Sequence, residues 1–177
     1  MTDKEILISW INLLGVKTGD QFKLSSGIES NTYIDMKSVF LHNRVHKLLA
    51  NLLCEEVKKF APVEAVAGVA LGGCHLASIV AMVSPVPLDV MYIRKNAKEH
   101  GMQKLIERPN MFIQQEVVLL EDVITTGKSA VDAADLIVNS GFIVKGIISV
   151  VDRREQKVPY LGRYPFSSLV DFEELNI

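Results

Sequence analysis

The segment Val118–Gly127 contains residue types that together could bind a sugar phosphate. It reads Val-Leu-Leu-Glu-Asp-Val-Ile-Thr-Thr-Gly and continues into Lys128-Ser129 and a helix-like stretch. Glu121 and Asp122 could accept hydrogen bonds from vicinal hydroxyls, whereas the residues after them could offer backbone N–H groups, hydroxyls and a helix N-terminus to a phosphate. Carboxylates for a diol and amides for a phosphate describe a ribose 5-phosphate site. The alternative is a buried strand whose polar residues merely cap a helix, and the length of the motif argues against it.

Two common nucleotide-binding motifs do not fit the chain. Gly127-Lys128-Ser129 resembles the end of the phosphate loop of nucleoside triphosphatases, but that motif requires glycine where this chain has Asp122. The dinucleotide motif G-x-G-x-x-G is also missing from the sequence. The sequence therefore favours a sugar phosphate over a nucleoside triphosphate or a dinucleotide.

Cationic side chains are concentrated just after a second apolar run. Arg94, Lys95, Lys98 and His100 fall within seven positions, followed by Gly101 as a possible joint. A charge run is usually a solvated loop, but this one leaves the end of an expected buried strand, where ligands bind. Such cations could stabilise a departing pyrophosphate.

Ala70-Leu71-Gly72-Gly73 also follows an apolar run and could bring backbone N–H groups close to an anion. A simple tight turn between a strand and a helix explains the two glycines equally well. For His75, a buried or helix-start position is the preferred interpretation, with ligand contact as the alternative.

The composition limits the class of protein. The 177 residues suit one domain, and the formal net charge of −2 argues against a nucleic-acid binder with a broad basic surface. Cys54 and Cys74 have neither metal nor disulfide spacing, which indicates a reduced, cytoplasmic location. Residues 63–83 are apolar enough to suggest a membrane span, but Glu64 and Gly72-Gly73 favour a strand, a turn and a buried helix.

Apolar patterning predicts an α/β fold with a mostly parallel central sheet flanked by helices. Helices are expected at residues 3–14, 42–60, 74–83 and 129–140, and buried strands at 66–71, 88–93, 117–120 and 147–151. Two short β-like pieces, 22–24 and 32–36, precede this alternating pattern. Ligands should lie at the carboxyl ends of the parallel strands, where the polar motifs described above are found.

The polar motif at 118–127 resembles the phosphoribosyl pyrophosphate (PRPP) signature of type I phosphoribosyltransferases. Three further stretches resemble the orotate phosphoribosyltransferases in particular: 22–27 with 30–35, 94–101, and 151–155. The resemblance covers about 13–155 and implies one domain over 1–177, with a small hood mainly at 15–40 and a core at about 41–155.

The resemblance also implies roles for individual residues. Lys98, His100 and Asp122 would be catalytic residues. PRPP would be bound by Arg94, Lys95, Lys98, His100, Glu121, Asp122, Val123, Ile124, Thr125, Thr126, Gly127, Lys128, Ser129, Gly72 and Gly73. Orotate would be bound by Ser25, Tyr33, Ile34, Thr125 and Arg153.

The implied reaction displaces pyrophosphate from PRPP by orotate and gives orotidine 5′-monophosphate. Mg²⁺ would be held mainly by PRPP and water, with no protein metal ligands. The resemblance further implies a homodimer in which Lys95 serves the neighbouring subunit. A phosphoribosyltransferase for a purine and a non-catalytic PRPP-binding regulator remain as alternatives. The sequence departs from the family at Cys74-His75 and at Arg108. Relatives commonly have glycine at the position of Arg108, and Pro109-Asn110 could supply the turn instead.

Overall fold

The computed structural model describes residues 1–23, 27, 29–94, 105–109 and 114–177. In chain order the elements are α1 (Asp3–Trp10), the π-helix η1 (Ile11–Gly15), β1 (Val16–Lys23), β2 (Glu29–Ile34), α2 (Met36–Phe40), α3 (Asn43–Lys58), β3 (Ala65–Val69), α4 (Gly72–Val83), β4 (Asp89–Ile93), β5 (Ile106–Glu107), β6 (Glu116–Ile124), α5 (Lys128–Asn139), β7 (Ile143–Asp152), β8 (Tyr160–Leu161), β9 (Tyr164–Asp171) and the 3₁₀-helix η2 (Phe172–Glu174).

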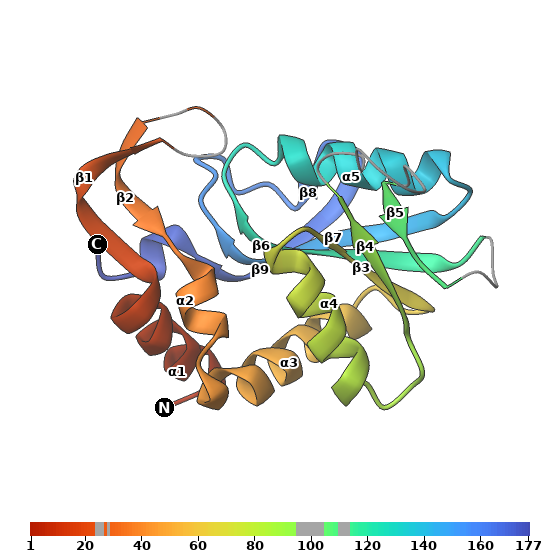
Figure 1. Ribbon diagram of the computed structural model, residues 1–177, viewed down its shortest axis with the longest axis horizontal. Coiled ribbons are helices and arrows are strands. Elements are labelled where there is room, and N and C mark those ends of the chain that lie inside the picture. Colours follow the sequence, from red (N-terminus) through yellow and green to blue (C-terminus); the bar gives the residue numbers. More distant parts are fainter. Residues whose placement is uncertain (24–26, 28, 95–104, 110–113) are drawn as a thin grey trace.

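The central sheet has the strand order β5-β4-β3-β6-β7-β9-β8 (Figure 1). Strands β4, β3, β6, β7 and β9 are parallel, and the two short outer strands β5 and β8 are antiparallel to their neighbours. The expected α/β fold with a mostly parallel sheet is therefore confirmed.

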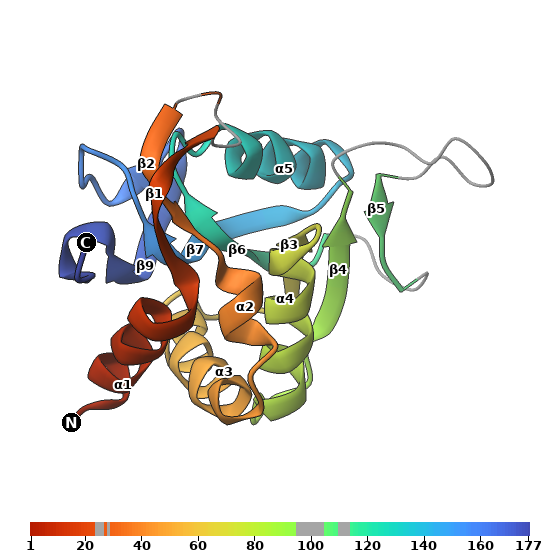
Figure 2. The same ribbon diagram turned by 60° about the vertical axis from the view of Figure 1, so that its left-hand side comes forward.

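Helices cover both faces of this sheet. Helices α1 to α4 lie on one side and α5 on the other (Figure 2). The side chains of β6 alternate between the two layers: Val118 and Leu120 pack towards α3 and α4, whereas Val117 and Leu119 pack towards α5. Burial on both faces explains why these strands are almost continuously apolar.

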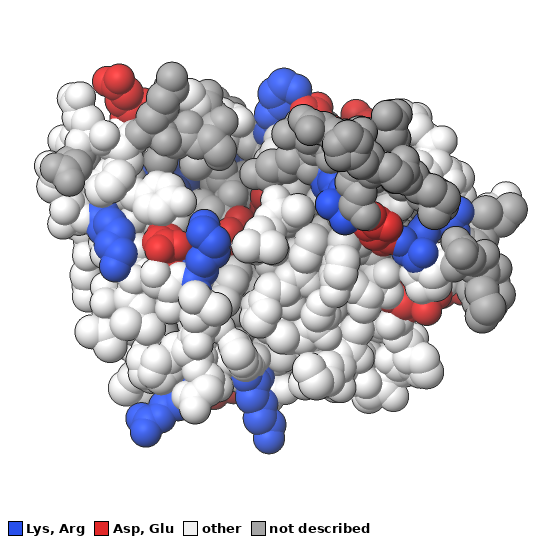
Figure 3. Space-filling model, in the orientation of Figure 1, with Lys and Arg blue, Asp and Glu red and all other residues white. Residues whose placement is uncertain are grey.

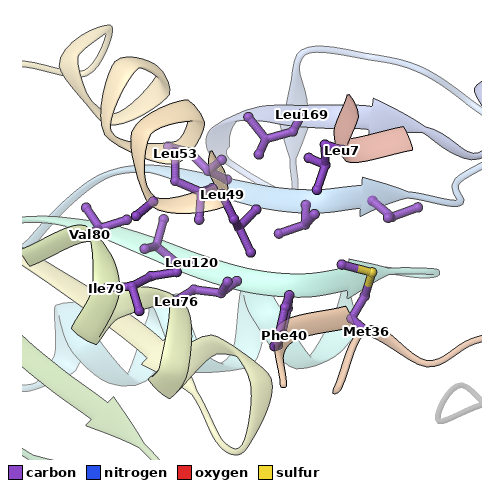
Figure 4. Packing of buried hydrophobic residues seen from close by; sticks show 14 of the residues in the cluster. Leu7, Met36, Phe40, Leu49, Leu53, Leu76, Ile79, Val80, Leu120 and Leu169 are labelled. Carbon is purple, nitrogen blue, oxygen red and sulfur yellow. The ribbon is translucent and has the colours of Figure 1, made fainter. Parts of the chain in front are cut away.

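The larger core lies between the sheet and helices α1 to α4. Leu49 and Leu53 of α3 meet Leu76 and Val80 of α4 over Leu120 of β6 (Figure 4). All five side chains are fully buried. This packing fixes α3 and α4 on the sheet and so fixes the turn that begins α4.

The N-terminal part forms a separate two-stranded antiparallel sheet, β1-β2, beside the main sheet (Figure 1). It is attached to the rest of the molecule through Ile34 and through Met36, Val39 and Phe40 of α2, which are all buried in the larger core. We call β1, β2 and α2 the hood, because β2 stands next to the carboxyl ends of β6 and β7, as the bonds from Arg153 to Ser30 and Thr32 show.

Several elements differ from the sequence expectations. Met36 was expected in a strand but begins α2, and β1 starts at Val16 rather than near Phe22. Strand β6 continues to Ile124 instead of ending at Leu120. Residues 160–171 add β8 and β9 to the sheet, beyond the core limit expected near residue 155.

Residues 63–83 contain β3 and the whole of α4, in agreement with the strand, turn and helix that their sequence predicts. Within the described part of the chain, no helix has the length and apolar character needed to cross a membrane.

Candidate functional site

The turn between β3 and α4 lies directly against the end of β6. A Cβ added to Gly72 would come within 2.3 Å of Asp122 Oδ2, and one added to Gly73 would come within 2.4 Å of the Leu120 carbonyl oxygen. Gly68 is similarly close to the Gly73 carbonyl (1.9 Å for an added Cβ). Any side chain at these positions would push the turn away from Asp122. The two predicted anion-binding segments are therefore adjacent.

The two acids of the motif are part of β6 rather than of the following loop. Glu121 is 5% exposed, and Asp122 is half-buried with its Oδ1 accepting a hydrogen bond from the Val123 N–H at 2.9 Å. Beyond Leu120, the described residues show β6 paired with β7 alone, as far as Ile124 and Asp152, because the β3 pairing ends at Gly68. The free edge of this last part of β6 places Asp122 beside the Gly72 turn.

The segment after β6 turns sharply into α5 at Gly127. This glycine has φ of +79°, and an added Cβ would meet Leu161 Cδ1 at 2.3 Å. Thr126 Oγ1 accepts a long hydrogen bond from the Lys128 N–H (3.4 Å), while Lys128 Nζ pairs with Asp132 at 2.5 Å. Helix α5 thus begins at the carboxyl end of the sheet, and its first N–H groups have no carbonyl acceptors within the helix. This is the geometry of an anion site.

Arg153 follows β7 and connects the core to the hood. Its Nη1 donates to the Thr32 carbonyl and its Nη2 to Ser30 Oγ, both at 3.3 Å. The guanidinium lies 4.3 Å from the centre of the Phe172 ring. Burial lowers the pKa of Arg153. The guanidinium nevertheless stays charged, as arginine does in proteins. A fixed cation therefore stands between the hood and the end of β7.

A cleft of about 600 Å³ lies between the hood and the carboxyl ends of β6 and β7. It is lined by Glu29, Ser30, Thr125, Thr126, Arg153, Arg154, Glu155, Gln156, Val158, Tyr160, Leu161 and Gly162. Thr125 and Arg153, which came from separate motifs, share this cleft. The sequence did not point to the 155–162 segment, because it has no charge cluster or glycine motif that would mark a binding loop.

Arg94 is held at the base of the cationic segment. Its Nε and Nη2 both lie 3.0 Å from Glu107 Oε1, and its N–H donates to the Leu105 carbonyl at 2.8 Å. Arg94 and Glu107 thus join the two ends of the β4–β5 connection. The expected sites Lys95, Lys98 and His100, and likewise Ser25, lie outside the described residues.

Two of the residues expected to contact the base are not among those that line the cleft. Ile34 is 5% exposed and belongs to the hydrophobic core, and Tyr33 packs with its ring centre 5.7 Å from that of Phe22. Their neighbours Ser30 and Thr32 reach Arg153 instead. Strand alternation explains the difference for Tyr33, which points to the opposite face of β2 from Ser30, whose hydroxyl reaches Arg153.

The three positions at which the sequence departs from the family have structural partners. Cys74 Sγ lies 3.4 Å from the Gly68 carbonyl, and burial raises the pKa of this thiol, so it is a poor nucleophile. His75 packs on Phe40 with ring centres 5.4 Å apart. Arg108 lies over the Phe142 ring at 4.9 Å.

Comparison with known proteins agrees with this architecture. A family model described as "Phosphoribosyl transferase domain" matches residues 38–167. An orotate phosphoribosyltransferase from Sorangium cellulosum is 42% identical over 136 residues, covering 75% of this chain and 71% of the relative. One from Pyrococcus abyssi is 40% identical over 153 residues, covering 86% and 82%. The crystal structure of Mycobacterium tuberculosis orotate phosphoribosyltransferase in complex with Fe(III) dicitrate superposes with a TM-score of 0.80 at 31% identity, covering 99% of this chain and 100% of that one.

The chain therefore belongs to the phosphoribosyltransferase family. Within that family it groups with the orotate phosphoribosyltransferases, and it is an enzyme of pyrimidine biosynthesis that transfers the phosphoribosyl group of PRPP to orotate.

Proposed function

We propose that the cleft between the hood and the carboxyl ends of β6 and β7 holds both substrates of this reaction. The phosphate of PRPP would lie at Thr125–Ser129 and the carboxylate of orotate at Arg153. The observation that supports this arrangement is that Thr125, Thr126 and Arg153 line one cleft of about 600 Å³. A guanidinium is suited to a planar carboxylate because it can donate two parallel hydrogen bonds.

The present bonds of Arg153 to the hood leave room for this role. Both are 3.3 Å long and have neutral oxygens as acceptors, so a carboxylate would be the stronger partner. Arg153 also has five N–H donors, of which these bonds use two. The hood strand β2 would then cover the base, with Ser30 beside it.

The chemistry needs a stabilised leaving group more than a strong base. As the bond from ribose C1 to pyrophosphate breaks, positive charge develops on the ribose and negative charge on pyrophosphate. We propose that the Gly72-Gly73 backbone, Lys98 and His100 bind pyrophosphate, with Arg94 at the base of their loop. Glu121 and Asp122 would bind the ribose hydroxyls, and the Val123–Ser129 backbone would bind the phosphate.

Mg²⁺ is our proposed cofactor. Bound to pyrophosphate, it would neutralise charge on the leaving group. Over the described residues, no group of three or more His, Cys, Asp or Glu side chains gathers as a metal-binding cluster. Because Mg²⁺ keeps several waters and is commonly bound through substrate phosphates, we propose that PRPP and water supply most of its ligands, with the Asp122 carboxylate beside Gly72 as the neighbouring acid.

The substrate assignment is tested by mixing the protein with Mg²⁺, PRPP and either orotate, hypoxanthine or uracil. We expect loss of orotate absorbance and no change with the other two bases. Turnover of hypoxanthine alone would identify a purine enzyme, and PRPP binding without any turnover would identify a regulator.

Arg153→Lys should raise the KM for orotate at least about tenfold while changing the KM for PRPP little, because a single ammonium cannot form the bidentate pair.

We also propose a homodimer formed through the face that carries α4. Leu71, Ser78 and Met82 follow one another at helical spacing on this face, and Tyr92 joins them through its hydroxyl, 2.6 Å from Ser78 Oγ. Leu71 is 74% exposed and Met82 78% exposed. Figure 3 shows that the middle of this face is a broad area without charged side chains.

A second copy of the chain is the occupant that such a face fits. In a twofold dimer a patch meets itself, so a charged patch would repel its copy, whereas an uncharged apolar patch packs against itself. The strand β4, which leads to Lys95, borders this face through Tyr92. This position supports the proposal that Lys95 serves the neighbouring subunit.

We further propose a cytoplasmic location. Its support is that Cys54 and Cys74 are both free thiols.

A further inference from the structure

Residues 155–162, which we call the cleft wall, form one side of the substrate cleft. Gln156, Val158 and Tyr160 line the cleft, and the wall ends in β8, which pairs with β9. Leu161 is 4% exposed and touches the position that a Cβ on Gly127 would occupy. The wall is therefore packed against the Gly127 turn, which is part of the proposed phosphate site.

One side chain, Arg154, fastens this wall to the sheet. Its Nη1 donates to the Tyr160 carbonyl at 2.8 Å and its Nη2 to the Val158 carbonyl at 3.1 Å. On its other edge, Nε lies 3.0 Å from Asp152 Oδ1 and Nη2 lies 2.9 Å from Asp152 Oδ2. The guanidinium also stacks 4.1 Å from the centre of the Phe166 ring of β9.

The pair of Arg154 and Asp152 is well buried. The Arg154 side chain is 10% exposed and that of Asp152 is 2% exposed. Asp152 is the last residue of β7 and also binds Lys157, whose Nζ donates to the Asp152 carbonyl at 2.8 Å. The wall is thus connected to Asp152, at the end of β7, near its beginning through Lys157 and near its end through Arg154.

Arg154 borders the cleft, but its donors are already committed to the protein. Four hydrogen bonds to Asp152, Val158 and Tyr160 use most of the five N–H groups of the guanidinium. Arg153, its neighbour, makes two long bonds to described residues. Consecutive arginines thus differ in kind: Arg153 can exchange partners for a ligand, and Arg154 cannot without releasing the wall.

We propose that Arg154 is a positioning residue for PRPP, which acts by holding the cleft wall, and through Leu161 the Gly127 turn, at the place that the ribose phosphate requires. The proposal rests on the proposed function, since it assumes that PRPP occupies the cleft. In this role Arg154 acts through the wall and not through a contact with the substrate. Its contribution to binding is that the wall is already in place when PRPP arrives, so no ordering is required on binding.

The competing explanation is that Arg154 only stabilises the fold, and two variants separate the possibilities. Arg154→Lys keeps the charge beside Asp152, but one ammonium cannot reach both wall carbonyls and both carboxylate oxygens in the planar arrangement of arginine. The double variant Asp152→Asn/Arg154→Met removes both buried charges together, so neither is left unpaired. The amide introduced by Asp152→Asn would retain an oxygen that can accept the bond from the backbone N–H of residue 154, which Asp152 Oδ1 now accepts at 3.0 Å.

The measurement is the Kd for PRPP with Mg²⁺, determined by titration calorimetry, together with the melting temperature of each protein. We expect both variants to weaken PRPP binding by about tenfold or more, because a wall that is no longer held in place must be ordered when PRPP binds. The double variant should do so with a melting temperature close to that of the unaltered protein.

Arg163→Met is the matched control. Arg163 lies in the turn of the β8–β9 hairpin, next to the cleft wall, and its guanidinium also lies over an aromatic ring, that of Tyr164 at 5.1 Å, but it pairs with Asp135 at the surface and its side chain is 65% exposed. Its replacement should leave the Kd for PRPP unchanged within about twofold, because surface pairs of this kind contribute little.

The outcomes separate the two proposals. An unaltered Kd in both Arg154 variants, with the unaltered protein binding PRPP, would overturn the positioning role of Arg154 alone. A lowered melting temperature with an unaltered Kd would show a purely structural arginine. Failure of the unaltered protein to bind PRPP would overturn the proposed function, and the role of Arg154 with it.

Discussion

His75 is a residue whose charge state is set by its neighbours. It packs on Phe40 and has its ring centre 5.1 Å from that of His46, and its Nε2 is buried with no hydrogen-bond partner among the described residues. Burial first, and then the nearby His46, lower the pKa of His75. The neutral form is therefore the one that the fold accommodates, which agrees with a half-buried histidine near the start of α4 better than with a ligand to phosphate.

This environment predicts a loss of stability in mild acid. Below the ordinary histidine pKa of about 6.5 the unfolded chain takes up a proton at His75 that the folded chain still refuses, so stability falls as the pH falls. We expect the melting temperature to decrease between about pH 7.5 and 5.5, a window above the carboxylate pKa values. In His75→Phe, which retains a ring against Phe40, this decrease should be smaller.

His75→Gln provides the companion measurement, because it also removes the titrating group but keeps a polar side chain. If both variants retained the full decrease, His75 would not be its source. Activity is not expected to depend on this residue, since His75 does not line the cleft.

At the scale of elements, glycines determine how closely the site segments approach one another. Gly127 satisfies two requirements at the β6–α5 turn, a left-handed backbone and space for Leu161. Gly141, after α5, satisfies only the first: its φ is +91° and an added Cβ would have nothing within 4 Å. The two positions allow the backbone requirement to be separated from the packing requirement.

We expect Gly127→Ala to destabilise the protein by about 2–4 kcal/mol, combining about 1–2 kcal/mol for a left-handed alanine with a similar cost for overpacking against Leu161. Gly141→Ala should cost only the backbone part, about 1–2 kcal/mol. Urea unfolding of the two variants measures the difference. PRPP binding should weaken only in Gly127→Ala, and equal stability losses would mean that Leu161 moves aside without cost.

The sequence predicted the elements with strong periodicity and missed those defined by tertiary pairing. The amphipathic α3 and the apolar strands β3, β4 and β7 carry their pattern in their own residues. By contrast, β9 contains Pro165 and two consecutive serines, and it becomes a strand only because β7 and β8 pair with it. The extension of β6 through two acids has the same cause, namely the pairing with β7.

The site was predictable to the extent that its chemistry is encoded in short motifs. The 118–129 motif, Gly72-Gly73 and Arg153 are brought together at the carboxyl ends of β3, β6 and β7, as parallel strands require. The cleft wall was not predictable, because Tyr160 and Val158 are held there by the side chain of Arg154, a long-range consequence of the fold. Likewise, the sequence did not show that the Ile34 side chain would be buried in the hydrophobic core and not line the cleft.

At the scale of the whole molecule, the site lies between the hood and the carboxyl ends of the central sheet. Arg153 bonds to the hood strand β2, while the uncharged α4 face lies beside β4 through the hydrogen bond between Ser78 and Tyr92. A substrate in the cleft would bind to both the hood and the core. A second subunit on the α4 face would bring its own β4, the strand that precedes Lys95, near this one. Each site would then be complete only in the dimer, because Lys95 would come from the neighbouring subunit.

A surface substitution tests the interface. Met82→Lys, at 78% exposure, should leave the fold intact but place like charges opposite each other in a twofold dimer, and so convert it to monomers. Ile143→Lys, at 51% exposure and outside the α4 face, is the matched control and should remain dimeric. Light scattering after size-exclusion chromatography gives the mass. A Met82→Lys protein with the same mass as the unaltered one would place the interface elsewhere.

Subunit complementation tests whether the dimer shares its sites. Lys95→Ala and Arg153→Ala should each be nearly inactive, but if Lys95 acts in the neighbouring subunit, a mixed dimer contains one site with neither lesion. Random exchange makes half of the dimers mixed, so a one-to-one mixture should recover up to about a quarter of the unaltered activity.

A mixture of Arg153→Ala with Asp122→Asn is the control. It would regenerate no intact site, because each site takes both Arg153 and Asp122 from one chain. Recovery should therefore occur in the first mixture and not in the second, and it should disappear when Met82→Lys is added to both partners. No recovery in the first mixture would show that Lys95 serves its own subunit.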